Sequence, residues 1–497
     1  MLERAVTVNA ARPREAAAGI ERVEVAAVNL PARRSLYLKH EKVYPKLAHG
    51  TFRRIKWLAL AAMLAIYYVA PWLRWDRGLG FPDQAILIDF PARRFYFFFI
   101  EIWPQQVYLV TGLLIVAALV LFLITSLAGR VWCGYACPQT VWTDLFIAVE
   151  RLIEGDRAAR IRLDQGALTA SKVAKKAAKH VAWIAIASAT GGAWVFYFAD
   201  APTLARELAA FEAPTVAYLF VGVFAAATYL LGGFAREQVC TYMCPWPRIQ
   251  AALQDEHSLI VTYRTDRGEP RGPLRKGESW HGRGHCIDCN NCVAVCPAGI
   301  DIRDGHQLQC ISCALCIDAC NAVMSKIGLP RGLVAYDTLE NEVRRAHGEP
   351  ARYRWLRPRT VLYAGLIAVV GVAMLAALLL RSDLDLTVER DRNPVYVLLS
   401  DGMIRNGYTL KAINKTYAKR TLTLALDGLP GAHVAIVGSD VGDTATFTVE
   451  PDKLRSVRVY VRAPAGTLAH EATPIRFTVR DAAGSATVSS ALQGPKR

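Results

Sequence analysis

Eight of the twelve cysteines stand in two runs whose spacing is typical of iron–sulfur ligands. The first run reads C-x2-C-x2-C-x3-C-P and the second reads C-x2-C-x2-C-x3-C. In this bacterial two-cluster pattern, three thiolates of a run wrap one cluster and the fourth reaches the other. Zinc is the alternative, but zinc sites use C-x2-C pairs on longer loops rather than triplets. The spacing predicts one [4Fe–4S] cluster on Cys286, Cys289, Cys292 and Cys320, and a second on Cys310, Cys313, Cys316 and Cys296.

The other four cysteines form two copies of a second motif, C-x-Y-x-C-P, at residues 133–138 and 240–245. Each copy follows an apolar segment, so the chain contains an internal repeat. On a helix, thiols four residues apart share one face. Two such units related by a pseudo-two-fold axis would gather four soft thiolates, which suit Cu(I), zinc or an iron–sulfur unit. Cysteine also packs as a small hydrophobe, but the repeated tyrosine and proline favour a redox or metal site at Cys133, Cys137, Cys240 and Cys244.

Five apolar segments are long enough to cross a bilayer, which requires about 20 residues per helix. They are residues 55–73, 107–129, 181–198, 214–235 and 360–380. The first begins behind a polar, basic stretch, which distinguishes it from a cleaved signal peptide. An aromatic patch at residues 95–100 is expected to lie in the membrane interface as an amphipathic or re-entrant piece. A sixth, short membrane element is the alternative for that patch.

The distribution of Lys and Arg predicts how these segments are oriented. Basic residues concentrate before the first segment and in alternate loops, which is the positive-inside pattern of a multi-pass protein of the bacterial inner membrane. The amino terminus and all twelve cysteines would then lie in the cytoplasm, and the carboxyl terminus in the periplasm. Cysteines grouped in a reducing compartment indicate metal or redox chemistry rather than disulfides.

Charge and histidine content argue against two other functions. The net charge is +16 with 53% hydrophobic residues. The basic residues flank apolar segments and form no stripe interleaved with aromatics, so no nucleic-acid partner is predicted. None of the ten histidines lies inside an apolar segment. A membrane haem would need axial histidines there, so no haem is expected.

The predicted fold class is an α-helical membrane protein with an inserted cytoplasmic 2[4Fe–4S] ferredoxin domain of the bacterial type. Beyond residue 380 the chain turns polar, and its short β-branched, alternating segments predict an immunoglobulin-like β-sandwich. The predicted domains are a mostly disordered cytoplasmic arm at 1–54, ordered near the membrane at 43–46 and 50–53; a four-helix membrane domain at 55–235; the ferredoxin-like domain at 236–358; a fifth membrane helix at 359–380; and the periplasmic sandwich at 381–497.

The chain resembles the cytochrome c oxidase accessory protein family, called CcoG, FixG or RdxA, along nearly its whole length. The resemblance rests on both C-x-Y-x-C-P motifs, the run from Cys286 to Pro297, and the sequences Tyr44-Pro45, Asp89-Phe90-Pro91 and Cys316-Ile317-Asp318-Ala319-Cys320. It implies a cupric reductase that supplies Cu(I) for the assembly of cbb3-type cytochrome oxidases. Asn321 departs from the pattern, because the family often has an acid there.

The resemblance makes copper the substrate, bound and reduced at Cys133, Cys137, Cys240 and Cys244 with electrons from an unknown cytoplasmic donor. Oxidase assembly factors or a copper transporter would be the partners. One alternative is a quinol-oxidising membrane polyferredoxin that feeds another redox partner, which quinol-dependent reduction of the clusters in membranes would favour. The other is a non-catalytic copper-binding assembly scaffold, whose clusters would never change redox state during copper handling.

Overall fold

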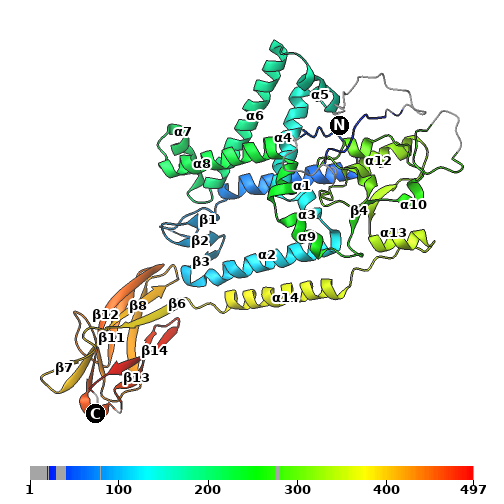
Figure 1. Cartoon of the computed structure of the whole chain (residues 1–497). Coiled ribbons are helices and arrows are strands. Elements are labelled where there is room, and N and C mark those ends of the chain that lie inside the picture. Colours follow the sequence, from blue (N-terminus) through cyan, green and yellow to red (C-terminus); the bar gives the residue numbers. More distant parts are fainter. Residues whose placement is uncertain are drawn as a thin grey trace, which may run out of the picture. The chain divides into compact units, whose positions relative to one another are not determined.

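The computed structural model describes residue 20 and residues 22–29, 41–78, 80–274, 280–468 and 470–495. The chain forms two compact units, Met1–Met374 and Leu375–Arg497 (Figure 1). The first unit contains all twelve cysteines, and the second is built from two β-sheets.

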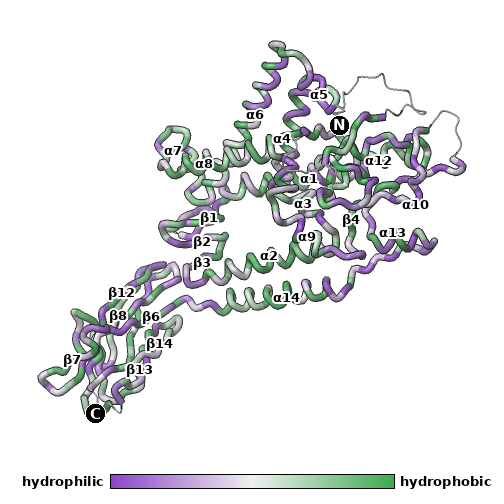
Figure 2. Tube along the Cα trace, viewed as in Figure 1, coloured by the Kyte–Doolittle hydropathy of each residue, from purple (hydrophilic) through white to green (hydrophobic). Residues whose placement is uncertain are grey.

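Within the described residues, four helices are long and apolar enough to cross a membrane (green in Figure 2). They are α1 (Thr51–Val69) with η3 (Ala70–Trp72), η4 (Pro104–Gln106) with α2 (Val107–Ala128), α8 (Thr215–Thr228) with η5 (Tyr229–Ala235), and α14 (Pro358–Leu379). At most 22% of the apolar stretch of each is buried inside the protein. A helix that is apolar on all sides yet exposed requires lipid around it. Four of the five predicted membrane segments are thereby confirmed.

The remaining predicted segment, 181–198, lies in α6 (Ala170–Val195), which is less apolar than the other four. Lysines occupy its first half, and its second half contains serine, threonine and glycine. These small residues let α6 pack closely on α8, because a Cβ atom on Gly191 would lie 2.4 Å from the carbonyl oxygen of Val221. Close approach through small residues is typical of helix pairs in membranes.

The aromatic patch at 95–100 belongs to a three-stranded antiparallel sheet. Its strands are β1 (Ile86–Asp89), β2 (Arg94–Phe97) and β3 (Ile100–Ile102), paired in that order. The ion pair between Arg94 and Glu101, at 3.0 Å, joins the neighbouring strands β2 and β3. Strand pairing satisfies the backbone hydrogen bonds within the sheet itself, and the position of the patch in the membrane interface stays a prediction.

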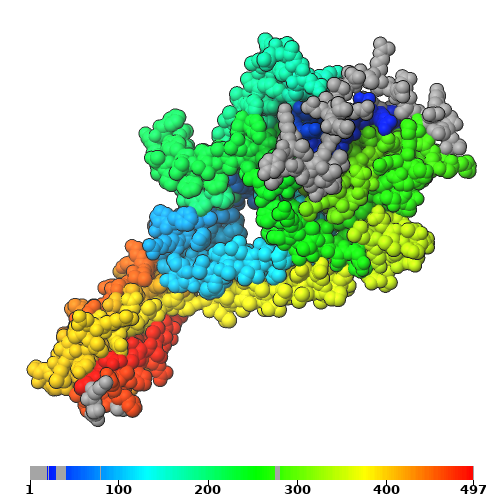
Figure 3. Space-filling model, in the orientation of Figure 1, coloured from blue at the N-terminus to red at the C-terminus, as the bar shows by residue number. Residues whose placement is uncertain are grey.

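Part of the amino-terminal arm packs on the ferredoxin part (Figure 3). The backbone N–H of Val23 donates to the carbonyl oxygen of Cys289 at 3.0 Å, and that of Asn29 donates to Gly299 at 3.1 Å. Ile20 is buried in the apolar core of the ferredoxin part, together with residues such as Cys286 and Ile300. The expectation of a mostly disordered arm is therefore wrong for residues 22–29, because their backbone pairs with the cysteine loops. Residues 1–19, 21 and 30–40 lie outside the described part of the chain.

The ferredoxin part is a two-stranded sheet with short helices that contain cysteines of the two runs. Strand β4 (Ile260–Tyr263) pairs with β5 (Val334–Asp337), and the helices are α11 (Asn291–Ala294) and α12 (Leu315–Lys326). The carboxylate of Asp318 on α12 accepts the backbone N–H groups of Phe52 at 3.3 Å and Arg53 at 2.7 Å. These N–H groups lie in the first turn of α1, where a capping carboxylate stabilises the helix. Asp318 thus ties the ferredoxin part to the first membrane helix.

A buried ion network joins α4 (Pro138–Glu154), α5 (Arg157–Gln165) and α6. The Glu150 carboxylate, which is fully buried, lies 3.1 Å from Arg160, 3.6 Å from Lys179 and 2.9 Å from Arg236. Burial raises the pKa of Glu150, but the positive charges of Arg236, Lys42 and Arg160 outweigh burial and hold the pKa at about 2. The other short elements of the unit are α7 (Ala201–Ala210), α10 (Thr265–Gly268), η7 (Ile302–Asp304) and α13 (Leu339–Ala346).

The second unit is a β-sandwich, as the sequence predicts. One sheet has the order β10-β12-β8-β6, with β7 beside β8, and the other has the order β11-β9-β13-β14. The strands are β6 (Leu384–Arg390), β7 (Val397–Leu398), β8 (Met403–Asn414), β9 (Arg420–Asp427), β10 (His433–Ile436), β11 (Thr444–Val449), β12 (Lys453–Pro464), β13 (Ala472–Arg480) and β14 (Ser485–Gln493). Alternate residues such as Tyr408, Leu410, Leu422 and Leu424 are fully buried between the sheets, as expected for paired antiparallel sheets.

Candidate metal centres

The eight cysteines of the two runs surround two small cavities in the ferredoxin part. Cys286, Cys289, Cys292 and Cys320 line one cavity. Cys296, Cys310, Cys313 and Cys316 line the other, together with Cys292. Each cavity therefore combines three thiols of one run with the last thiol of the other, which is the crossed arrangement that the spacing predicts. Thiols placed around a cavity, rather than converging on a point, fit the corners of a cubane cluster.

The two cysteine loops have the same backbone conformation. Asp288 and Asn290 have φ of 53° and 57°, and the equivalent residues of the second run, Ser312 and Ala314, have φ of 53° and 59°. Left-handed conformations are costly for residues other than glycine and tend to occur at functional sites. Their repetition at equal spacing shows that both runs fold into the same turn, which points successive thiols toward one cavity.

Burial controls the charge of these thiols. It raises the pKa of Cys296 and Cys320 to about 12 and that of Cys310 to about 11, and neighbouring thiolates add to the effect. Burial also raises the pKa of Cys292 and Cys316 well above the ordinary value of a thiol. A metal cluster must displace these protons when it binds. Among the described residues, no three His, Cys, Asp or Glu side chains are placed to hold a single metal ion.

The two C-x-Y-x-C-P motifs follow equivalent breaks in the chain. The residue at each break has a positive φ, which is 58° at Gly129 and 41° at Arg236. The first part of each motif is helical, in α3 (Val131–Tyr135) and η6 (Val239–Met243), and a new helix, α4 or α9 (Trp246–Leu253), begins beside the motif's proline. The second cysteines, Cys137 and Cys244, are extended at the junction. The expectation that both thiols of a motif share one helix face is wrong, because each helix ends before its second cysteine.

The four thiols of these motifs nevertheless lie near one another. Burial raises the pKa of Cys133 and Cys137, and raises that of Cys240 to about 12, with further increases from the other thiols of the group. The Cys133 thiol donates to the side-chain oxygen of Gln250, on α9 of the second repeat, at 3.0 Å. The hydrogen bond of Cys133 joins the two repeats. Because no three of these thiols are placed to hold one metal ion in the described part of the chain, the four-thiolate site stays a prediction.

The first motif packs directly on one cysteine loop of the ferredoxin part. A Cβ atom on Gly134 would lie 2.6 Å from the carbonyl oxygen of Ile311 and 3.0 Å from the Cα atom of Cys313. The Tyr135 hydroxyl donates to the carbonyl oxygen of Cys313 at 3.1 Å. Cys133 and Cys313 belong to one apolar cluster. A direct, water-excluded contact thus joins the membrane motif to the second cysteine run.

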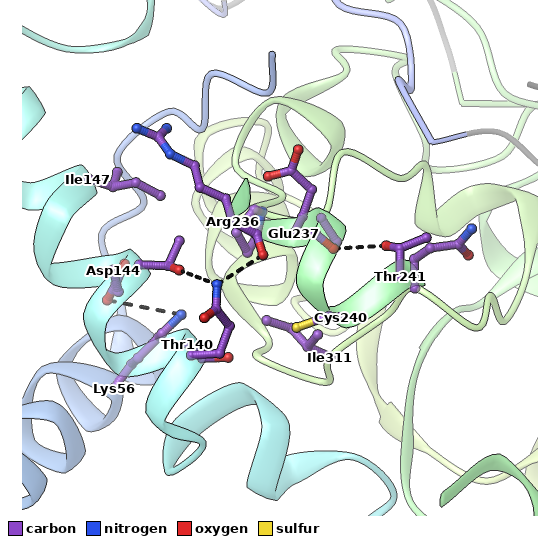
Figure 4. Close-up of a pocket in the computed structure, with 14 residues that line it drawn as sticks. Lys56, Thr140, Asp144, Ile147, Arg236, Glu237, Cys240, Thr241 and Ile311 are labelled. Atoms are coloured by element: carbon purple, nitrogen blue, oxygen red, sulfur yellow. Dashed lines mark hydrogen bonds and ion pairs between the residues drawn. The ribbon is translucent and has the colours of Figure 1, made fainter. Parts of the chain in front are cut away.

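The second motif meets the ferredoxin part across a cavity instead. Cys240 lines this cavity together with Pro297 and Ile311, which belong to the cysteine loops (Figure 4). On another wall of the cavity, Lys56 of α1 lies 4.0 Å from Asp144 of α4. The cavity therefore separates the second motif from the loops that the first motif touches.

The sequence interpretation missed Arg130, which stands three residues before the first motif. Its side chain is buried at 1% exposure, and its Nη1 atom donates to the carbonyl oxygen of Leu308. Its position in the sequence could have drawn attention to it, because a basic residue near a cysteine lowers the pKa of the thiol.

These features define a membrane iron–sulfur protein with a dicluster ferredoxin part and a separate β-sandwich. Three family models match the chain: a 4Fe-4S dicluster domain at residues 235–339, a 4Fe-4S binding domain at 110–154, and the IG-like fold at the C-terminal of FixG at 374–495. The second of these matches includes Cys133 and Cys137.

Two curated relatives extend the likeness to nearly the full length. The chain is 52% identical over 483 residues to the nitrogen fixation protein FixG of Rhizobium meliloti (strain 1021), which covers 91% of this chain and 92% of the relative. It is 52% identical over 471 residues to Protein RdxA of Cereibacter sphaeroides, covering 93% and 99%. A crystal structure of a FixG-related protein from Vibrio parahaemolyticus is 28% identical, with a TM-score of 0.20, over 23% of this chain and 97% of that one. The chain belongs to the FixG family.

Proposed function

We propose that this protein passes single electrons to Cu(II) and releases Cu(I) for the assembly of a cbb3-type cytochrome c oxidase. The observation that carries the proposal is the contact of Gly134 and Tyr135 with the loop that contains Cys313. This contact joins the ferredoxin part to a group of soft thiols, which are the ligands that Cu(I) prefers. Reduction of Cu(II) to Cu(I) takes one electron, and [4Fe–4S] clusters, when bound, store electrons singly.

The proposal assigns two roles to the cysteines. Cys286, Cys289, Cys292 and Cys320 would hold one cluster, and Cys310, Cys313, Cys316 and Cys296 the other, as the two cavities support. Cys133, Cys137, Cys240 and Cys244 would receive copper. The cluster nearer the membrane motif would then be the one on the second run, since Gly134 touches that run.

The proposed location is the bacterial inner membrane, with the amino terminus and ferredoxin part in the cytoplasm and the sandwich in the periplasm. The support is the concentration of Lys and Arg in the loops on the ferredoxin side. A cytoplasmic donor would supply the electrons, and oxidase assembly factors or a copper transporter would take Cu(I).

Anaerobic EPR on the purified full-length protein tests the proposal. Reduction with dithionite should give [4Fe–4S] signals, and titration with Cu(II) should abolish them as Cu(I) forms. A variant with serine at Cys133, Cys137, Cys240 and Cys244 should keep its cluster signals in the presence of Cu(II). Met243→Leu is the matched control, because it changes an exposed sulfur side chain of the second motif. Copper reduction by the serine variant at the wild-type rate would refute the assignment.

A further inference from the structure

Arg130 is a buried cation with little to neutralise it. Its Nη1 atom donates to a neutral carbonyl group, that of Leu308. Its Nε and Nη2 atoms are buried without a well-aligned hydrogen bond, although the guanidinium faces the Cys133 thiol. Among the described residues, no carboxylate forms an ion pair with it. Several other buried arginines of this unit are paired with a carboxylate: Arg160 and Arg236 share Glu150, and Arg53 pairs with Asp144. An unpaired charge in a dry interior is strongly unfavourable unless an anion compensates it.

Both groups of thiols lie within electrostatic range of this cation. Arg130 stands three residues before Cys133, whose side chain lies in one apolar cluster with Cys313 of the second cysteine run. Leu308, whose carbonyl oxygen accepts the hydrogen bond, stands two residues before Cys310. Arg130 therefore lies between the membrane motifs and the second run.

The local fold keeps the side chain there. The residue before it, Gly129, has a φ of 58°, and a Cβ atom on it would lie 2.8 Å from the carbonyl oxygen of Leu259. The chain thus turns sharply as α2 ends, and Arg130 follows as the N-cap of α3. The equivalent position of the second repeat, three residues before Cys240, is Glu237, so the repeat itself does not require a cation.

We infer that Arg130 is the buried countercharge that raises the reduction potential of the cluster on Cys310, Cys313, Cys316 and Cys296. The inference rests on the proposed assignment of that cluster, but not on copper as the substrate. A [4Fe–4S] core with four thiolates is an anion whose negative charge increases by one on reduction. A fixed positive charge nearby therefore stabilises the reduced form more than the oxidised form. Arg130 is a positioning residue in this scheme and exchanges no electron or proton.

An EPR-monitored redox titration of the full-length protein, without copper, tests this inference. Arg130→Gln should make reduction of one cluster at least tenfold less favourable, which lowers its potential by about 59 mV for one electron. The other cluster should keep its potential. Arg130→Lys retains the charge and should titrate as the wild type does. Arg248→Gln, which removes an exposed cation near the second motif, should shift neither potential.

Unchanged potentials in Arg130→Gln would overturn the inference. Should Arg130→Gln not retain iron, the lysine variant decides: a wild-type potential supports the role of charge. A lowered potential in Arg130→Lys would assign the effect to the hydrogen bond to Leu308 and overturn it. The outcome is separable from the proposed function, because a protein that fails to reduce Cu(II) can still show the shift in potential.

Discussion

The two C-x-Y-x-C-P motifs have the same pattern but different surroundings. In the first, the tyrosine, Tyr135, reaches the carbonyl oxygen of Cys313, and Gly134 leaves no room for a side chain. In the second, Tyr242 is 44% exposed, and Thr241 takes the place of the glycine. The difference teaches that the repeat sets the path of the backbone, whereas the close packing of Gly134 and Tyr135 on the loop of Cys313 is a feature of the first copy. Exchange of residues between the copies can therefore separate the two roles.

Removal of the Glu150 charge, which joins the two repeats, should have the largest effect on the stability of the protein. Glu150, on the helix after the first motif, pairs with Arg236 at the break before the second. Glu150→Gln leaves Arg160, Lys179 and Arg236 without this anion, so we expect a loss of about 3–5 kcal/mol in the free energy of unfolding. Denaturant unfolding in detergent measures it. Glu212→Gln, at an exposed position, should change stability by less than about 0.5 kcal/mol.

Because the pKa of Glu150 is lowered in the folded protein, we expect its contribution to stability to depend on pH. Its pKa in the folded protein is about 2, below the ordinary value of 4.5. A lowered pKa stabilises the folded state fully above the unfolded-state pKa, and the stabilisation disappears as the pH falls through the folded-state value. The difference in stability between the wild type and Glu150→Gln should therefore narrow as the pH is lowered from about 5 toward 2. A stability difference between the two proteins that grows as the pH falls would contradict the lowered pKa of Glu150.

Gly134→Thr, which gives the first motif the residue of the second, should have the next largest effect. The new Cβ atom would meet the carbonyl oxygen of Ile311 at 2.6 Å. Relief of this overlap should cost about 1–3 kcal/mol and displace the loop of the second cysteine run. We expect loss of one of the two cluster signals, measured by EPR and iron content. Thr241→Gly, the reciprocal change in the second motif, should retain both cluster signals. Loss of a cluster signal in Thr241→Gly would mean that the two motifs support the cysteine loops equally.

The smallest expected effect concerns the two tyrosines. Tyr135→Phe removes the hydrogen bond to Cys313, which should cost about 1 kcal/mol in stability. Tyr242→Phe should change stability by less than about 0.5 kcal/mol, because its side chain is largely exposed. Thermal unfolding of both variants under identical conditions measures the difference. Equal effects would mean that the contact of Tyr135 does not distinguish the first motif.

Several features of this protein follow from the sequence alone. The spacing of Cys286 through Cys320 predicts the crossed sets of thiols, since ligand spacing within a tight turn is a local property of the chain. Hydropathy predicts four of the membrane helices, and strand alternation beyond residue 380 predicts the sandwich, because these patterns also act over short distances. For the same reason the repeat of the motifs is visible in the sequence, whereas the equivalent breaks at Gly129 and Arg236 appear only in the structure.

Only the tertiary structure decided which repeat touches the cysteine loops, where residues 22–29 pack, and that Arg130 lies buried between two groups of thiols. Each of these contacts joins residues that are more than 150 positions apart in the chain, as Gly134 and Ile311 are. No local periodicity encodes such a contact. It depends on how apolar surfaces, capping groups such as Asp318 and buried charges are satisfied together when the helices and the ferredoxin part assemble.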